Sequence, residues 1–312
     1  MQMESAQNHP FEQTRPVGLF NRIAVKGKIN VSLHTGAKNA RLVLHGDPRD
    51  LQHVSSRVVN NILRIRVAGG YPRYGEISTE IFSQYLNGFD YTGAGTITGN
   101  RIHSGLLDLG INNPGQTKLA GSMVLRKLSA AGGGNIELHG VRTRLLLLKI
   151  EGKTKVQLAG VISLSRLDLN GDGLLSMYWV KSDRLEICSR GHTFIQLGGV
   201  VDRLDVELWD SAHFNGRFLR AKSAFIKTHG KSIADITVLK HQHTLALDTS
   251  NIYFYKIPQT KADFMAFDGA VLDMRDWNRF DLRDYDRYNS RSSAGRSNLV
   301  KRPLSTMELD NL

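Results

Sequence analysis

A short theme recurs about every 20 residues between Leu119 and Tyr255. A leucine, one further residue and a glycine open four copies, whose glycines are Gly121, Gly140, Gly160 and Gly199. The spacings of these glycines are 19, 20 and 39 residues, so a degenerate copy, Tyr178-Trp179-Val180, falls in the double gap. A fixed period of this length predicts a solenoid, in which each copy forms one turn.

Each copy also carries two apolar residues separated by a single residue. The pairs are Leu128/Ala130, Leu148/Ile150, Leu167/Leu169, Leu185/Ile187, Leu204/Val206 and Leu245/Leu247. Side chains two apart on a strand point to the same face, so each pair is predicted to face one interior. Glycines that follow the pairs suit the corners of a coil, because glycine adopts positive φ without steric cost. The pattern therefore predicts an all-β fold, a single-stranded parallel β-helix with coils of about 20 residues.

The rest of the chain divides around this solenoid. Residues 1–18 read as a flexible leader, residues 19–68 as N-terminal strands that cap the solenoid, and residues 69–95 as an aromatic, Gly- and Pro-rich loop. Within the cap, residues 50–58 are expected to form a short helix or an irregular connection. The parallel β-helix is predicted over residues 96–273, and a basic, aromatic and irregular tail over residues 274–312.

Composition narrows the classes of function. The chain of 312 residues has 41 Lys and Arg against 29 Asp and Glu, a formal net charge of +12. This surplus favours anionic partners, such as an acidic glycan or another anionic surface, without choosing among them. Cys188 is the one cysteine, so neither an intramolecular disulfide nor a thiolate metal site is expected. No transmembrane segment and no signal peptide are predicted, and no motif of nucleic-acid recognition is evident.

A ladder of acids is the strongest candidate for catalysis, because some parallel β-helices are polysaccharide lyases or hydrolases. With the apolar pairs as register, the residues between pair members are Lys149, Asp168, Glu186 and Asp205 in successive turns. The same register places Arg166, Arg184 and Arg203 two residues before the three acids, on the same outer face. We expect each arginine to neutralise its neighbouring acid, which is more typical of a solvated wall than of an active site. No catalytic residue, metal ligand or cofactor is predicted.

Aromatic and basic residues outside the repeat are the candidate contacts with partners. In the loop these are Tyr71, Tyr74, Phe82, Tyr85, Phe89 and Tyr91. In the tail, arginines recur every four residues among aromatic side chains, and the candidates are Arg275, Trp277, Arg279, Phe280, Arg283, Tyr285, Arg287 and Tyr288. For the loop aromatics, packing against the solenoid or contact with a protein is favoured over stacking on sugars or single-stranded nucleic acid, and a solvated segment is the alternative for the tail.

The strands near the N-terminus carry a resemblance to a known family. The residues concerned are Phe20-Asn21-Arg22-Ile23, Val25-x-Gly27, Val31-x-Leu33-x-x-Gly36, Leu44-His45-Gly46-Asp47, Leu51-x-x-Val54 and Leu63-x-Ile65. This run resembles the head-GIN-domain family of autotransporter-adhesin heads, most clearly over residues 20–67. The resemblance implies a parallel β-helix in a bacterial envelope and supplies no catalytic motif. The aromatic segment at 69–95 and the long basic tail depart from the family pattern.

The favoured hypothesis is a non-catalytic envelope protein of the periplasm, outer membrane or cell surface. It could act as an adhesin-like head, or as an accessory subunit of a large outer-membrane assembly such as a secretion apparatus. Its expected partners are other envelope proteins in a multi-subunit assembly. The alternative is a carbohydrate-active or glycan-binding β-helix protein, and a nucleic-acid partner is the least favoured.

Overall fold

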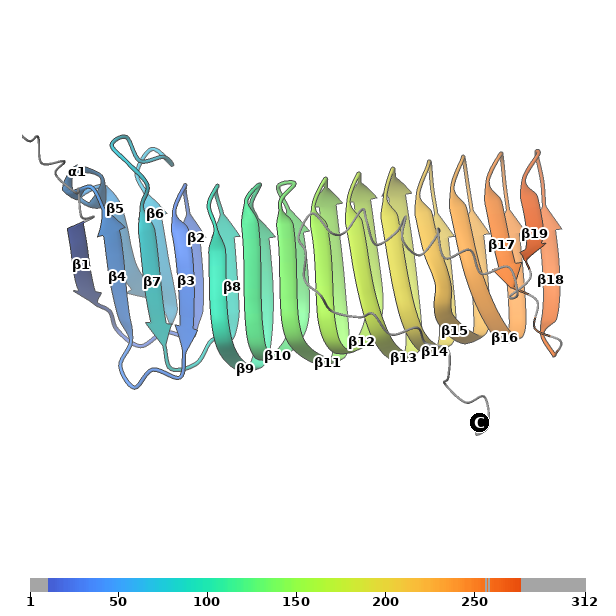
Figure 1. The fold of residues 1–312 in the computed structure, drawn as a ribbon, viewed down its shortest axis with the longest axis horizontal. Coiled ribbons are helices and arrows are strands. Elements are labelled where there is room, and N and C mark those ends of the chain that lie inside the picture. Colours follow the sequence, from blue (N-terminus) through green and yellow to red (C-terminus); the bar gives the residue numbers. More distant parts are fainter. Residues whose placement is uncertain (1–10, 256, 258, 276–312) are drawn as a thin grey trace, which may run out of the picture. The chain divides into compact units, whose positions relative to one another are not determined.

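Long strands that wrap around a common core dominate the computed structural model, which describes residues 11–255, 257 and 259–275. Eight of these strands follow one another along the chain: β9 (Ile97–Asn112), β10 (Gln116–Ala131), β11 (Asn135–Gly152), β12 (Lys155–Gly171), β13 (Leu174–Gly191), β14 (Phe194–Leu208), β15 (His213–Thr228) and β16 (Ile233–Ala246). Each makes most of one turn and pairs in parallel with the next, as Figure 1 shows. The described residues form a parallel β-solenoid of about nine turns, so the predicted fold class is confirmed.

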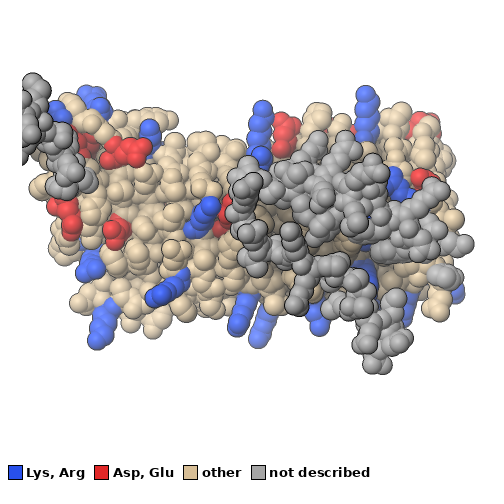
Figure 2. Space-filling model, in the orientation of Figure 1, with Lys and Arg blue, Asp and Glu red and all other residues tan. Residues whose placement is uncertain are grey.

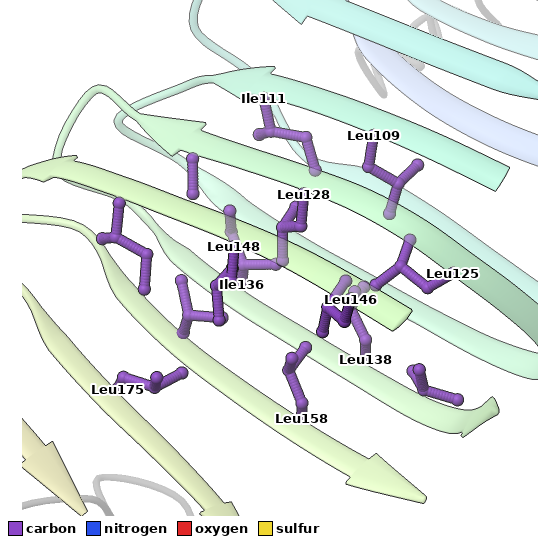
Figure 3. Close-up of a cluster of buried hydrophobic side chains, with 14 of the residues drawn as sticks. Leu109, Ile111, Leu125, Leu128, Ile136, Leu138, Leu146, Leu148, Leu158 and Leu175 are labelled. Carbon is purple, nitrogen blue, oxygen red and sulfur yellow. The ribbon is translucent and has the colours of Figure 1, made fainter. Parts of the chain in front are cut away.

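The core is a column of leucines that runs through the turns. The five predicted leucines, Leu128, Leu148, Leu167, Leu185 and Leu204, are all between 0% and 2% exposed. Figure 3 shows Leu128 and Leu148 stacked among Leu109, Leu125 and Leu146. The last predicted pair is wrong, because at the end of β16 the buried residues are Thr244 and Ala246, whereas Leu245 is only half-buried.

The N-terminal turns are stacked out of sequence order. One turn contains β2 (Arg22–Lys26) and β3 (Asn30–Thr35), a second contains β6 (Ile62–Val67) and β7 (Ser78–Ser83), and a third joins β8 (Gly88–Thr92) to β9. Strand β2 pairs in parallel with both β6 and β8, and β3 pairs in parallel with both β7 and β9. The first turn of the sequence therefore lies between the second and the third (Figure 1).

These pairings correct two predicted boundaries. Parallel stacking begins well before residue 96, because the capping strands expected over residues 19–68 already contribute whole turns. Residues 69–95 do not form one loop, since they contain β7 and β8. The aromatic composition misled the prediction: Phe89 and Tyr91 are strand residues of the core, 0% and 1% exposed.

A cap of antiparallel strands covers the N-terminal end. It consists of β1 (Phe11–Pro16), β4 (Arg41–Gly46), the helix α1 (Pro48–Leu51) and β5 (Val54–Val59). Strand β1 pairs with β4, β4 pairs with β7, and β5 pairs with β6, all antiparallel. Residues 11–16 are thus a paired strand rather than part of a flexible leader, and only the first half of the segment 50–58 is helical or irregular.

The opposite end of the solenoid closes with short strands. These are β17 (Asn251–Tyr255), β18 (Lys261–Ala266) and β19 (Val271–Arg275). The first half of β16 pairs with β17 and the second half with β18, while β19 pairs with β17. All six residues of β18 are exposed. The predicted tail lies outside the described residues apart from its first two positions, which belong to β19.

Candidate interaction surface

The predicted ladder of acids exists in part, with a different register. Lys149 pairs with Asp168 as expected, and Glu186 pairs with Asp205. Between β12 and β13, however, Asp168 lies opposite Cys188, and Arg166 lies opposite Glu186. The prediction was wrong by two residues because a shift of two keeps every apolar pair facing inward, so the pattern is blind to it.

Arginines hold the carboxylates of this wall, as the sequence predicted. Arg166 Nε lies 2.9 Å from Asp168 Oδ2, and Arg203 Nε lies 3.2 Å from Asp205 Oδ2. The expected pair of Arg184 with Glu186 is absent from the described contacts, and Arg184 instead lies 3.0 Å from Asp205 Oδ2. The Asp168 carboxylate raises the pKa of Arg166 through their hydrogen bond and charge attraction. These acids therefore lie in an ion-paired wall.

The predicted aromatic contacts fall into two groups. Tyr71, Tyr74 and Tyr85 are exposed by 53% to 66% and remain available to a partner. The Arg49 guanidinium covers one face of the Tyr74 ring at 3.7 Å from its centroid. Phe82 is half-buried between the His34 ring, 4.6 Å away, and the Arg41 guanidinium, 4.1 Å away.

The buried pair of aromatics serves the core instead. The Tyr91 hydroxyl donates to the carbonyl oxygen of Ile29 at 2.9 Å, and burial raises the pKa of Tyr91 to about 12. Phe89 stacks on it with a centroid distance of 6.4 Å. Sequence composition alone did not separate these two from the exposed tyrosines.

Of the predicted contacts in the tail, only Arg275 is described. Its guanidinium lies 3.7 Å from the centroid of the Tyr253 ring, and its Nη1 lies 3.5 Å from Asp235 Oδ1. Arg275 is thus engaged with the last turns of the solenoid. The other candidates lie outside the described residues: Trp277, Arg279, Phe280, Arg283, Tyr285, Arg287 and Tyr288.

Titratable side chains form one notable cluster near the N-terminal end. The two oxygens of Glu80 lie 3.7 Å from His34 Nε2 and 3.5 Å from His45 Nε2. A shallow hollow of about 250 Å³ beside Ser32 and Thr98 adjoins this cluster. Across the described part of the chain, no group of three or more His, Cys, Asp or Glu has an arrangement that could hold a metal ion. Cys188 is half-buried, and burial raises the pKa of its thiol.

At the corner where the Leu-x-Gly motif ends, two turns carry a bulky residue at positive φ in place of glycine. Gly121, Gly140, Gly160 and Gly199 adopt positive φ there, and a Cβ on any of them would lie 1.8 to 2.1 Å from a carbonyl oxygen of the preceding turn. In β13 this motif position is Trp179, with φ of 65° and 64% of its surface exposed, and in β9 it is Arg101, with φ of 64°. A bulky residue at positive φ is a conformational outlier, and such outliers gather at functional positions.

This corner was missed as a candidate surface, although the sequence held the signal. The copy Tyr178-Trp179-Val180 was noticed only as a degenerate repeat, and the exposure of Val161 and Val200 in adjacent turns does not follow from the pattern. Tyr178 and Phe218 lie over Gly198, which follows in the turn next to Tyr178. A Cβ on Gly198 would lie 3.2 Å from Tyr178 Cδ1 and 3.6 Å from Phe218 Cβ.

Comparison with known proteins decides the family. A family model described as "Putative auto-transporter adhesin, head GIN domain" matches residues 19–165 and 141–258, most of the described solenoid. The chain belongs to the head GIN domain family. The resemblance found in the sequence over residues 20–67 is therefore confirmed.

Solved structures of two putative adhesins are similar to this head GIN domain protein. One is the crystal structure of a putative adhesin from Parabacteroides distasonis, with a TM-score of 0.50 and 15% identity, covering 86% of this chain and 98% of that one. A second, of a putative adhesin from Parabacteroides merdae, has a TM-score of 0.46 and 12% identity over 86% and 97%. The search of curated proteins gives no match. Among the described residues of this head GIN domain protein, no helix is both long and apolar enough to cross a membrane.

Proposed function

We propose that this head GIN domain protein is a non-catalytic structural and interaction protein of the bacterial cell envelope, which presents the walls of its solenoid to surface partners. The observation that carries the proposal is the ion-paired wall. Asp168 and Asp205 accept hydrogen bonds from Arg166 and Arg203, so neither carboxylate is set up as the free acid or base that glycoside hydrolysis requires. The adhesin description of the family and of its structural relatives agrees with this role.

A regular solenoid suits such a task because each turn repeats the same outward positions. Stacked parallel strands give a stiff, extended surface on which side chains of neighbouring turns form rows. Tyr71, Tyr74 and Tyr85 add exposed aromatic side chains at the N-terminal end. Aromatic side chains of this kind commonly anchor protein contacts.

Membership of a larger outer-membrane assembly, such as a secretion apparatus, is a second candidate. The exposed apolar residues of the last turn favour it, since Phe264, Met265 and Phe267 are 45% to 52% exposed. The predicted docking residues beyond Arg275, in the basic tail, support the same role by their composition. In this role the protein would lie in the periplasm or at the outer membrane, and its partners would be other envelope proteins of the assembly.

Binding to isolated cell envelopes tests the main proposal. The full chain, immobilised on beads, is incubated with envelope fractions, alongside a truncated chain that ends at Arg275. We expect both chains to retain envelope material. If the tail docks partner proteins, the truncated chain should fail to retain those proteins. Lyase or hydrolase activity on acidic glycans that disappears in Asp168→Ala and Asp205→Ala, without loss of folding, would instead establish the carbohydrate-active alternative.

A further inference from the structure

The corner at Trp179 borders two outward rows of side chains on neighbouring turns. Buried Thr143 pairs with Ile162, and Ile162 pairs with Val180, which fixes the register here. In each turn, the residue that precedes this aligned position belongs to a first row of outward side chains. The residue that follows it belongs to a second row. The first row is Arg142, Val161, Trp179, Gly198 and Phe218, and the second is Arg144, Ser163, Lys181, Val200 and Arg220.

The second row alternates cations with small side chains. Arg144, Lys181 and Arg220 lie in β11, β13 and β15, so a turn without a charge separates each from the next. Adjacent turns are about 4.8 Å apart, which places successive cations about 10 Å apart along one line. All three are exposed, and within the described parts of the chain none of them forms an ion pair. In Figure 2, Lys and Arg side chains project past the lower edge, where the long strands bend in Figure 1.

Acidic side chains border the second row on one side only. Asp183 and Asp202 follow Lys181 and Val200 by two residues, and Lys222 Nζ already holds Asp202 Oδ1 at 2.8 Å. On the other side lies the first row, which begins with exposed Arg142 and is otherwise uncharged, and in which Val161 is 67% and Trp179 64% exposed. Tyr178, 37% exposed, and half-buried Phe218 extend the apolar strip over Gly198.

We propose that these two rows bind an extended acidic polysaccharide with one carboxylate or sulfate per disaccharide. This proposal rests on the proposed function and names the chemistry of its partner. The anionic groups would lie against Arg144, Lys181 and Arg220, because two sugar units of an extended chain span about the distance of two turns. The apolar face of a sugar ring would stack on the Trp179 indole, since flat apolar faces pair with aromatic rings.

Two observations favour this occupant over other polyanions. A single strand of nucleic acid carries a phosphate on every nucleotide, which suits a continuous basic groove rather than cations on alternate turns. A lipid surface would require a broad basic and apolar face, whereas Asp183 and Asp202 border this row. The indole itself is held outward by backbone at positive φ, at the end of the motif that has glycine in β12 and β14.

The sequence offers a variant that removes the platform and leaves the fold intact. Trp179→Gly restores the residue that the corner has in the adjacent turns, so the thermal midpoint should stay the same or rise. A second variant replaces Arg144, Lys181 and Arg220 by serine, the residue that the row already has at Ser163. The matched control replaces Lys127, Lys153 and Lys155 by serine, which gives the same change of charge on exposed lysines elsewhere.

Binding of the full chain to hyaluronan, which has one carboxylate per disaccharide, tests the proposal by calorimetry at two salt concentrations. We expect salt-dependent binding that is weakened about tenfold or more in Trp179→Gly and in the triple row variant. The control variant should bind within about twofold of the parent, and neutral dextran should not bind.

The proposal is overturned if hyaluronan does not bind, if the control variant loses as much as the row variant, or if Trp179→Gly binds normally. It is also overturned if oligo(dT) or phosphatidylglycerol vesicles bind more tightly through the same residues. If the triple row variant still retains envelope material, the polysaccharide site is not what binds it. The proposed function would then stand, and this site would not be part of it.

Discussion

At the scale of single residues, the corner glycines carry the tightest constraint in the fold. Gly160 has φ of +153°, and a Cβ there would lie 1.9 Å from the Val141 carbonyl oxygen. Gly152 also has positive φ, +70°, but a Cβ on it would meet nothing within 4 Å. Comparing the two glycines separates the cost of positive φ from the cost of a clash with the preceding turn. Positive φ is common to both, whereas the clash occurs only at Gly160.

We therefore expect Gly160→Ala to lower the free energy of unfolding by about 3 kcal/mol or more, and Gly152→Ala by about 1 kcal/mol. Urea unfolding followed by circular dichroism measures both. Equal losses in the two variants would show that contact with the preceding turn is not what requires glycine at the corner.

Tyr91 links a buried side chain to the pH dependence of stability. Its folded pKa of about 12 lies above the ordinary value of 10, so the folded state holds the proton more tightly than the unfolded state. The resulting stability is present below pH 10 and is lost as the pH rises toward 12. Between pH 9 and pH 11 the loss from this residue amounts to about 1 kcal/mol.

Tyr91→Phe should remove this part of the alkaline loss. The variant also leaves the Ile29 carbonyl without its donor, which should cost about 1 kcal/mol at pH 9. Urea unfolding of parent and variant at pH 9 and pH 11 gives the double difference, in which the other titrating groups cancel. A fall with pH that is as steep in the variant as in the parent would contradict the assignment.

At the scale of elements, Arg15 joins the first strand to the rest of the cap. Its Nη1 donates to the Val54 carbonyl oxygen at 2.6 Å and its Nη2 to the Leu51 carbonyl oxygen at 3.0 Å, so it bridges β1, α1 and β5. Arg15→Ala should release β1 from β4 by local opening, at a cost of about 1 to 3 kcal/mol. Hydrogen exchange of the β4 amides should rise while exchange in β12 stays the same. Uniformly faster exchange would mean that the cap unfolds only with the whole chain.

The elements also show how far the sequence could predict this structure. Periodicity was enough for the solenoid and for the inward column at Leu128 to Leu204, because an apolar pair must face the core in every turn. It failed where two registers satisfy the same pattern, as between β12 and β13, and where small residues replace leucine, as at Thr244 and Ala246. The surface at Trp179 was missed for a related reason: the sequence shows a degenerate copy there, but exposure depends on the corner geometry, whereas the pattern records only which residues are apolar.

At the scale of the whole described solenoid, the stacking of turns departs from chain order at the N-terminal end. In a solenoid each turn contacts only its neighbours, so damage to one turn should spread to the turns stacked against it. Strand β2 is stacked between β6 and β8, whereas β17 is stacked between β16 and the final strand β19. Two buried isoleucines at these places, Ile23 at 1% and Ile252 at 0% exposure, allow the same substitution at an internal and a terminal turn.

Burying an aspartate at either position should disrupt its own turn, because an unpaired charge is costly in an apolar core. Ile23→Asp should therefore raise hydrogen exchange in β2 and in both β6 and β8, although these strands begin about 40 and 65 residues later in the sequence. Ile252→Asp should raise it in β17 and in both β16 and β19, and leave β2, β6 and β8 protected. Exchange that rises only in the strands nearest in sequence to Ile23 would show that the turns are stacked in chain order, and would contradict the arrangement described above.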